Sequence, residues 1–134
     1  MNKKIRVYIA SPYTNGWYAD NIRRQIEAKH MLMDYGFIPF APLESHFSEI
    51  YKHRSEKEWL EYDLEWLMAC NILVRIRPND NFGIEIPSPG ADKEEETAKR
   101  KGLLIYNFNN LEELRNWAKG ANKEEIIGHL MGKW

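Results

Sequence analysis

Short runs rich in β-branched and aromatic residues alternate along this chain with longer segments of helical pattern, and this alternation constrains its fold most. The runs typical of strands are 5–10, 37–40, 71–76 and 103–106. Helical patterns cover 18–35, 55–69, 90–100, 111–119 and 123–131, with a further partly helical stretch at about 45–52. Alternation of this kind predicts a parallel sheet with helices on both faces.

Local signals place individual elements within that arrangement. Pro39 cannot donate to a sheet ladder, so the second strand is expected at an edge. The run 71–76 is continuously apolar and is expected to be central. We therefore predict an α/β, flavodoxin-like three-layer sandwich with strand order 2-1-3-4, formed by a single domain over residues 1–134.

The helices carry their own start, stop and burial signals. Gly36 is expected to end the first helix, and Ser55 with Glu58 forms a capping box that opens the second. The apolar positions expected to be buried are Ile22, Ile26, Met31 and Met33 on the first helix and Leu60, Leu64, Leu67 and Met68 on the second.

Composition narrows the class of protein. The net charge is −1, so the chain has no excess of positive charge that would favour binding to a nucleic-acid polymer or to an anionic membrane. The chain has one cysteine, Cys70, so an intramolecular disulfide is excluded. Met1 leads directly into the first strand, without a signal-peptide apolar region. We expect a cytoplasmic protein.

Several common catalytic motifs are absent. The loop after the first strand is Ser-Pro-Tyr-Thr-Asn-Gly, which is not a glycine-rich phosphate loop. The histidines lack metal-binding spacing, and no Gly-x-Ser-x-Gly nucleophile motif occurs. We therefore expect neither a metal nor a cofactor, and carboxylates remain as the candidate catalytic groups.

The segment from Ser88 to Ala98 carries the strongest local signal for a site. Pro89 and Gly90 break the chain before a helix whose first turn is expected to carry Glu94. The free N–H groups of a helix start favour a bound anion, and Glu94 places a carboxylate beside it. Alternatively, Ser88 is a helix cap and Glu94 is one of several acids that complement the helix dipole.

Other candidate residues have two interpretations each. Asp63 shares a helix face with Trp59 and Leu67, so it is either functional or bonded to a loop amide at the edge of the apolar stripe. Tyr8 points to the sheet face opposite to Val7 and Ile9, where most tyrosines are core residues. Because the loops 11–16, 41–46 and 77–89 all follow strands, they are expected to meet at one cleft.

Three segments in order resemble the nucleoside 2-deoxyribosyltransferase-like superfamily. They are Val7-Tyr-Ile-Ala-Ser-Pro-Tyr-Thr14, Asp63-Leu-Glu-Trp-Leu67 and Ser88-x-Gly-Ala-x-x-Glu94-x-x-x-Ala98. The superfamily includes nucleoside 2-deoxyribosyltransferases and 2′-deoxynucleoside 5′-monophosphate N-glycosidases. The resemblance extends over roughly Ile5 to Tyr106.

This resemblance implies roles for individual residues. Glu94 corresponds to the nucleophile that attacks the anomeric carbon, Tyr8 to the tyrosine that positions it, and Asp63 to the acid near the leaving base. Ser88 corresponds to the serine that binds a 5′-phosphate in the nucleotide hydrolases. The residues expected to bind substrate are Ser88, Gly90, Ser11, Tyr13 and His46, and Tyr13, Trp17 or Phe40 are candidates for stacking on a base.

The sequence leaves three functions open. The first is an enzyme that cleaves or transfers at the N-glycosidic bond of a nucleoside or nucleotide. The second is a catalytically silent nucleotide-binding or sensing module, suggested by the first loop, Tyr13-Thr14-Asn15. The third is an oligomeric scaffold whose interface is the segment 111–134, with Trp117, Leu130, Met131 and Trp134. The abundant aromatic residues, together with the resemblance, favour a homo-oligomer.

Overall fold

Four parallel strands form one sheet in the order β2-β1-β3-β4. Their bounds are β1 Arg6–Ala10, β2 Ile38–Phe40, β3 Ile72–Ile76 and β4 Leu104–Phe108. The structure is a computed structural model that describes residues 4–132, so Met1 and Trp134 lie outside the described residues. The order 2-1-3-4, with β2 at the edge and β3 inside the sheet, confirms the prediction.

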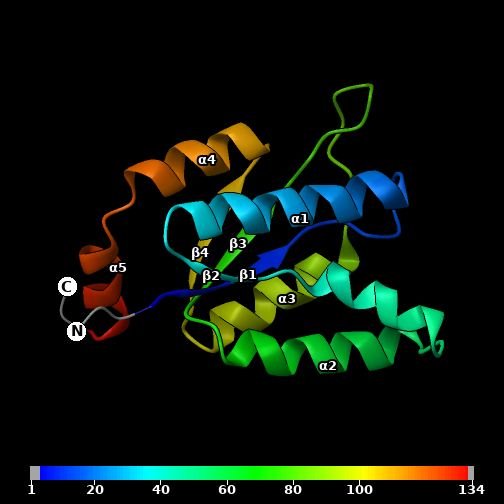
Figure 1. Cartoon of the computed structure of the whole chain (residues 1–134), viewed down its shortest axis with the longest axis horizontal. Coiled ribbons are helices and arrows are strands. Elements are labelled where there is room, and N and C mark those ends of the chain that lie inside the picture. Colours follow the sequence, from blue (N-terminus) through cyan, green and yellow to red (C-terminus); the bar gives the residue numbers. More distant parts are fainter. Residues whose placement is uncertain (1–3, 133–134) are drawn as a thin grey trace.

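Helices cover both faces of this sheet. Their bounds are α1 Tyr18–Asp34, α2 Glu56–Met68, α3 Pro89–Arg100, α4 Leu111–Gly120 and α5 Lys123–Leu130. Figure 1 shows α1 and α4 on one face and α2 and α3 on the other, with α5 at the end of the molecule opposite to η1, the 3-10 helix Pro42–Ile50. The fold is therefore the flavodoxin-like three-layer sandwich that the alternation predicted.

Strand alternation divides the apolar residues into two clusters. Val7 and Ile9 face the α1 and α4 side, together with Ile72, Val74 and Ile76 of β3. Tyr8 faces the opposite side with Leu73, where α2 and α3 contribute Leu67 and Ala98. Because successive strand residues point to opposite faces, Tyr8 reaches the α3 layer as expected.

Side-chain caps begin four of the helices. Ser55 accepts a hydrogen bond from the Glu58 amide at 3.1 Å, which confirms the predicted capping box. Ser88, Asn110 and Asn122 cap α3, α4 and α5 in the same way. Gly36 follows α1 with φ of 85°, a left-handed conformation in which a side chain would be strained.

The buried face of α1 differs from the predicted one. Its buried residues are Asn21, Gln25, Ala28 and Leu32, whereas Ile22, Ile26 and Met31 are half-buried and Met33 is exposed. The prediction was wrong because it scored apolar side chains alone. Asn21 and Gln25 are buried because they bond to backbone groups of neighbouring loops, an interaction that hydropathy does not register.

Other boundaries and burial patterns also differ. On α2 the residues Leu60, Leu64 and Leu67 face inward, but Met68 is 48% exposed because the helix ends there. Strand β4 continues to Phe108, two residues beyond the predicted end, since it pairs with β3 as far as Ile76. The stretch expected to be partly helical at 45–52 is a 3-10 helix that already begins at Pro42.

Candidate active site

A cavity of about 570 Å³ opens at the carboxyl ends of β1 and β2, between η1, α2 and the start of α3. Seven of the eight predicted site residues line it: Ser11, Tyr13, His46, Asp63, Ser88, Gly90 and Glu94. The eighth, Tyr8, lies beneath the cavity and reaches it through Glu94. Three loops that are distant in sequence therefore meet at one site, as the parallel sheet predicted.

The start of α3 forms one wall of the cavity. Ser88 accepts a hydrogen bond from the Ala91 amide at 3.2 Å, so the capping interpretation of Ser88 is confirmed. Glu94 lies in the second turn rather than the predicted first turn, because the helix already begins at Pro89. Its side chain is therefore set back from the amides of the helix start and faces the sheet.

Glu94 is buried and bonded to Tyr8. The Tyr8 hydroxyl donates to Oε2 of Glu94, and both residues are enclosed between β1 and α3. Burial raises the pKa of Glu94 to about 8, while the Tyr8 hydrogen bond and the charge of Arg75 act in the opposite direction. Burial first, and then the Glu94 charge, raise the pKa of Tyr8 well above its usual value, so Tyr8 remains a donor.

Asp63 is the second carboxyl group at the cavity. It lies on α2, and burial raises its pKa to about 7. Its charge also raises the pKa of Glu94. Oδ1 of Asp63 is buried without a hydrogen-bond partner in the described part of the chain. An acceptor in this state is destabilising until a donor reaches it.

Aromatic rings form the outer wall. Tyr13 and His46 stack with ring centroids 3.8 Å apart, and Trp59 lies 6.3 Å from His46 on the other side. Burial lowers the pKa of His46, which favours the neutral ring. Of the three residues suggested for stacking on a base, only Tyr13 lines this cavity, because Trp17 is exposed and Phe40 packs against Tyr8 and Trp66.

Two buried amides of α1 hold the loops of the site, and sequence reasoning missed both. Gln25 donates to the carbonyl of Ile9 at 3.2 Å and to Oγ of Ser11 at 3.0 Å, and it accepts from the amide of Leu43 at 3.1 Å. Asn21 donates to the carbonyls of Tyr13 and Asn15, each at 2.8 Å. Their spacing of four residues on one helix face was the available signal.

Lys57 and Lys93 also line the cavity and were not predicted. Both are exposed, and within residues 4–132 neither ammonium group forms an ion pair. Lys57 lies in the first turn of α2 and Lys93 at the start of the second turn of α3, so both charges lie near the positive end of a helix dipole. The exposed acid Glu56 lines the same cavity, so its mouth carries two cations and one anion from these three residues.

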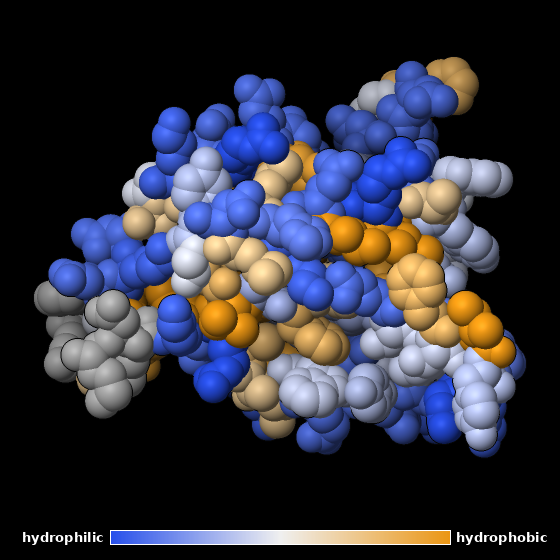
Figure 2. All heavy atoms as spheres, viewed as in Figure 1, coloured by the Kyte–Doolittle hydropathy of each residue, from blue (hydrophilic) through white to orange (hydrophobic). Residues whose placement is uncertain are grey.

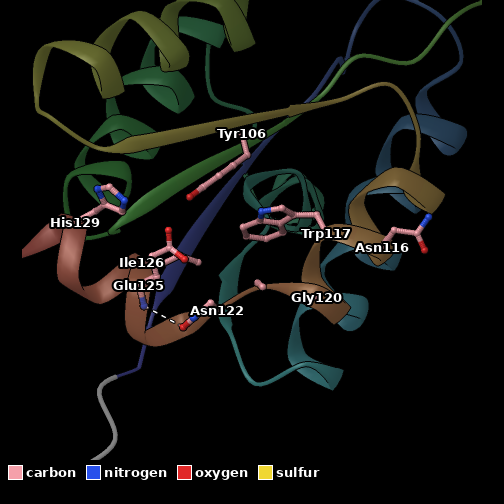
Figure 3. Close-up of a pocket in the computed structure, with 9 residues that line it drawn as sticks. Tyr106, Asn116, Trp117, Gly120, Asn122, Glu125, Ile126 and His129 are labelled. Carbon is pink, nitrogen blue, oxygen red and sulfur yellow. Dashed lines mark hydrogen bonds between the residues drawn. The ribbon is translucent and has the colours of Figure 1, made fainter. Parts of the chain in front are cut away.

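A second cavity, of about 430 Å³, lies between β4, α4 and α5 and contains none of the predicted site residues. Figure 3 shows the side chains of Trp117 and Tyr106 among its lining residues, and their ring centroids are 4.7 Å apart. Trp117 also stacks on Phe37 at 5.4 Å and contacts Phe108. Trp117 is half-buried and packs against the larger core, while the suggested interface over 111–134 stays a prediction.

Among residues 4–132 there is no cluster of three side chains able to hold a metal ion. Within that range, too, no helix has the length and apolar character needed to cross a membrane.

No protein-family model matches this sequence, and no curated protein matches it. A solved structure is similar to the chain: a 2-deoxyribosyltransferase from the psychrotolerant bacterium Bacillus psychrosaccharolyticus, described as a biocatalyst for the synthesis of antiviral and antitumoral nucleosides. The similarity has a TM-score of 0.65 at 18% sequence identity and covers 90% of this chain and 95% of the other. This chain therefore shares the fold of a 2-deoxyribosyltransferase over nearly its whole length.

Proposed function

We propose that this protein is an enzyme that cleaves or transfers at the N-glycosidic bond of a deoxynucleoside or its 5′-monophosphate. The observation that carries the proposal is the constellation of Tyr8, Glu94 and Asp63 at a cavity lined by aromatic rings. The fold shared with a 2-deoxyribosyltransferase supports it. Most enzymes that hydrolyse glycosidic bonds use two carboxyl groups that flank the bond to be broken.

The residues suggest a reaction in two steps. An ionised oxygen of Glu94 attacks the anomeric carbon while the bond to the base breaks, and Asp63 donates a proton to the departing base nitrogen. Tyr8 keeps the attacking carboxylate in place by its hydrogen bond. The resulting glycosyl ester is then attacked by water, which gives free sugar, or by a second base, which gives a new nucleoside. In either case Asp63 removes the proton of the attacking group.

Two cationic side chains at the cavity support a nucleotide rather than a nucleoside as substrate. Lys57 of α2 and Lys93 of α3 line the cavity together with Ser88. A 5′-phosphate bound here would contact the positive ends of the helices and the two ammonium groups. We accordingly expect Lys93→Met to raise KM for a monophosphate without changing KM for the corresponding nucleoside.

The decisive assay follows release of free base from deoxynucleosides and deoxynucleoside monophosphates, with and without an acceptor base, by chromatography. Base release without an acceptor identifies a hydrolase, and product only with an acceptor identifies a transferase. If the wild type releases no base from any substrate of the panel but binds a nucleotide saturably in calorimetry, the protein is instead the catalytically silent binding module.

Glu94→Gln is the variant that tests the nucleophile. We expect it to lower kcat by a factor of about 10⁴ or more, because the amide cannot form the glycosyl ester. Glu96→Gln, on the exposed face of the same helix, is the matched control and should retain full activity. Wild-type rates in Glu94→Gln would exclude Glu94 as the nucleophile.

We also propose that the protein acts in the cytoplasm as a homo-oligomer. Large apolar side chains are exposed on η1 and α2, including Phe47, Ile50, Tyr62 and Trp66. Figure 2 shows hydrophobic surface over η1 and at the tip of the loop between β3 and α3. Light scattering tests this proposal: an oligomeric wild type that becomes monomeric in Trp66→Glu would support it, and a monomeric wild type would exclude it.

A further inference from the structure

Strand β3 carries a buried arginine in an otherwise apolar run. The sequence of β3 is Ile-Leu-Val-Arg-Ile, and the Arg75 side chain is only 4% exposed. A guanidinium group at such a position is strongly destabilising unless anions surround it. The sequence prediction treated this strand as continuously apolar and assigned no role to Arg75, so the interactions of this residue need a separate explanation.

Two carboxylates of α3 meet this guanidinium group. Nη1 of Arg75 lies 2.7 Å from Oδ1 of Asp92 and 3.4 Å from Oε1 of Glu95. These two acids are three residues apart on the helix and flank Glu94 in sequence, so an arginine that holds both fixes the rotation of α3 about its axis. That rotation is what directs Glu94 toward Tyr8. Nε of Arg75 has no partner within residues 4–132.

We propose that Arg75 is a positioning residue for the reaction: it anchors α3 to the sheet through Asp92 and Glu95 and supplies the positive charge that favours the carboxylate form of Glu94. The inference rests on the proposed function in one respect, the role of Glu94 as nucleophile. The electrostatic link between Arg75 and Glu94 is a property of the protein itself and can be measured without a substrate.

Each packed element contributes a group that acts on Glu94. Tyr8 from β1 donates a hydrogen bond to its carboxylate, and Asp63 from α2 repels it. On α3 itself, Asp92 and Glu95 are the carboxylates that pair with Arg75. Arg75 from β3 is the cation of this set, and its charge lowers the pKa of Glu94 against the effect of burial.

The test is a carbon-13 NMR titration of the Glu94 carboxyl in protein labelled at glutamate, with its signal assigned by the Glu94→Gln variant. In Arg75→Met the pKa of Glu94 should rise above the wild-type value. In Arg75→Lys, which keeps the charge, it should stay near the wild-type value. Arg77→Met is the matched control, because Arg77 also contacts Glu95, at 3.3 Å, but is itself directed to Glu85 and Asn107.

A second variant keeps the test valid if Arg75→Met fails to fold. Asp92 is 66% exposed, so Asp92→Asn changes little of the core. It frees Arg75 from a competing carboxylate, so the charge of Arg75 should act more strongly on Glu94 and the pKa of Glu94 should fall. An unchanged Glu94 titration in both Arg75→Met and Asp92→Asn, or an equal rise in Arg77→Met, would overturn the proposal.

The same variants have a kinetic readout. In Arg75→Met we expect kcat/KM on the acid side of the pH profile to fall about tenfold, with rates recovering as the pH is raised. A uniform loss at every pH would indicate only a structural role and would overturn the proposal. If the wild type shows no activity, the proposed function fails, but the NMR titration still decides whether Arg75 controls Glu94.

Discussion

Glu94 and Asp63 are held where a carboxylate loses most of its hydration. Burial raises the pKa of Glu94 to about 8 and that of Asp63 to about 7. Each therefore binds a proton more tightly in the folded protein than in the unfolded chain. By linkage, these two groups make folding less favourable as the pH rises from their unfolded pKa values to their folded ones. This loss of stability is a consequence of burying two carboxyl groups at the cavity.

The first residue-scale prediction concerns stability. Glu94→Gln should raise the free energy of unfolding by roughly a few kcal/mol at pH 9, where the wild-type carboxyl is ionised and buried. At pH 4 the wild-type group is protonated in both states, so the gain should be absent. Urea unfolding at both pH values measures the difference. Glu96→Gln is the control, and an equal effect of both variants would contradict the prediction.

The second residue-scale prediction concerns the pH dependence of kcat/KM. Below about 7 both carboxyl groups are protonated and no nucleophile is present, whereas above about 8 both are ionised and no acid is present. Between these values most molecules have Asp63 ionised and Glu94 protonated, and the reactive pair, ionised Glu94 with protonated Asp63, is a minor form whose population is greatest there. We expect a bell-shaped kcat/KM with its maximum between these values. Asp63→Asn should lower kcat by about 10²–10⁴ and remove the alkaline limb. A variant that keeps the alkaline limb would show that another group is the acid.

At the scale of elements, α1 holds the loops of the site through a polar stripe rather than an apolar one. Gln25 joins the end of β1, the first loop and the start of η1 with three hydrogen bonds at 3.0–3.2 Å. All of these groups are buried. Asn21 holds the next part of the first loop, and Arg24 supports it with a hydrogen bond of 2.7 Å to its Oδ1. The shape of the cavity therefore depends on one helix face.

The prediction for this element is a change in substrate affinity. Gln25→Leu leaves the Ile9 carbonyl, the Ser11 hydroxyl and the Leu43 amide without partners, which should cost about 1–3 kcal/mol for each group that water cannot reach. We expect KM to rise more than kcat falls, since Glu94 and Asp63 remain in place. Steady-state kinetics and amide exchange of Leu43 test this. Glu27→Leu, exposed on the same helix, is the control, and an unchanged Leu43 exchange rate in Gln25→Leu would contradict the prediction.

At the scale of the whole molecule, the sheet separates an apolar core from the site. The α1 and α4 side contains most of the large buried aliphatic residues, and α5 adds Ile126 to it. Lys123 at the start of α5 donates to the carbonyl of Tyr35 and lies 4.9 Å from the centre of the Phe37 ring. The C-terminal helix is therefore part of the fold, far from the cavity that contains Glu94.

The prediction at this scale separates stability from activity. Ile126→Ala should lower the free energy of unfolding by about 2–5 kcal/mol, since it leaves a cavity in the larger core. The kcat/KM of the folded fraction should not change, because α5 contributes nothing to the site. Urea unfolding and kinetics measure the two quantities, with the exposed Glu124→Ala as the control. A selective loss of kcat/KM would show that the two faces of the sheet are coupled.

Patterns local in the chain were sufficient for much of the architecture. The edge position of β2 and the capping box at Ser55 follow from local signals, namely Pro39 and a hydrogen bond between residues three positions apart. The strand order follows from the fold class that the alternation of strands and helices predicts. The same patterns predicted that the loops after β1, β2 and β3 meet at one cleft. The resemblance to known enzymes then selected Tyr8, Asp63 and Glu94, residues that composition alone does not distinguish.

What the sequence by itself determined is therefore the layer arrangement, together with the end of the sheet at which the site lies. Only the tertiary structure decided which polar residues are buried: the amides of Asn21 and Gln25, and the guanidinium group of Arg75 between Asp92 and Glu95. The physical reason is that their partners are distant in sequence, as with Tyr8 and Glu94, which are 86 residues apart. A buried polar side chain is stable only when such a partner arrives, and hydrophobic periodicity contains no information about that partner.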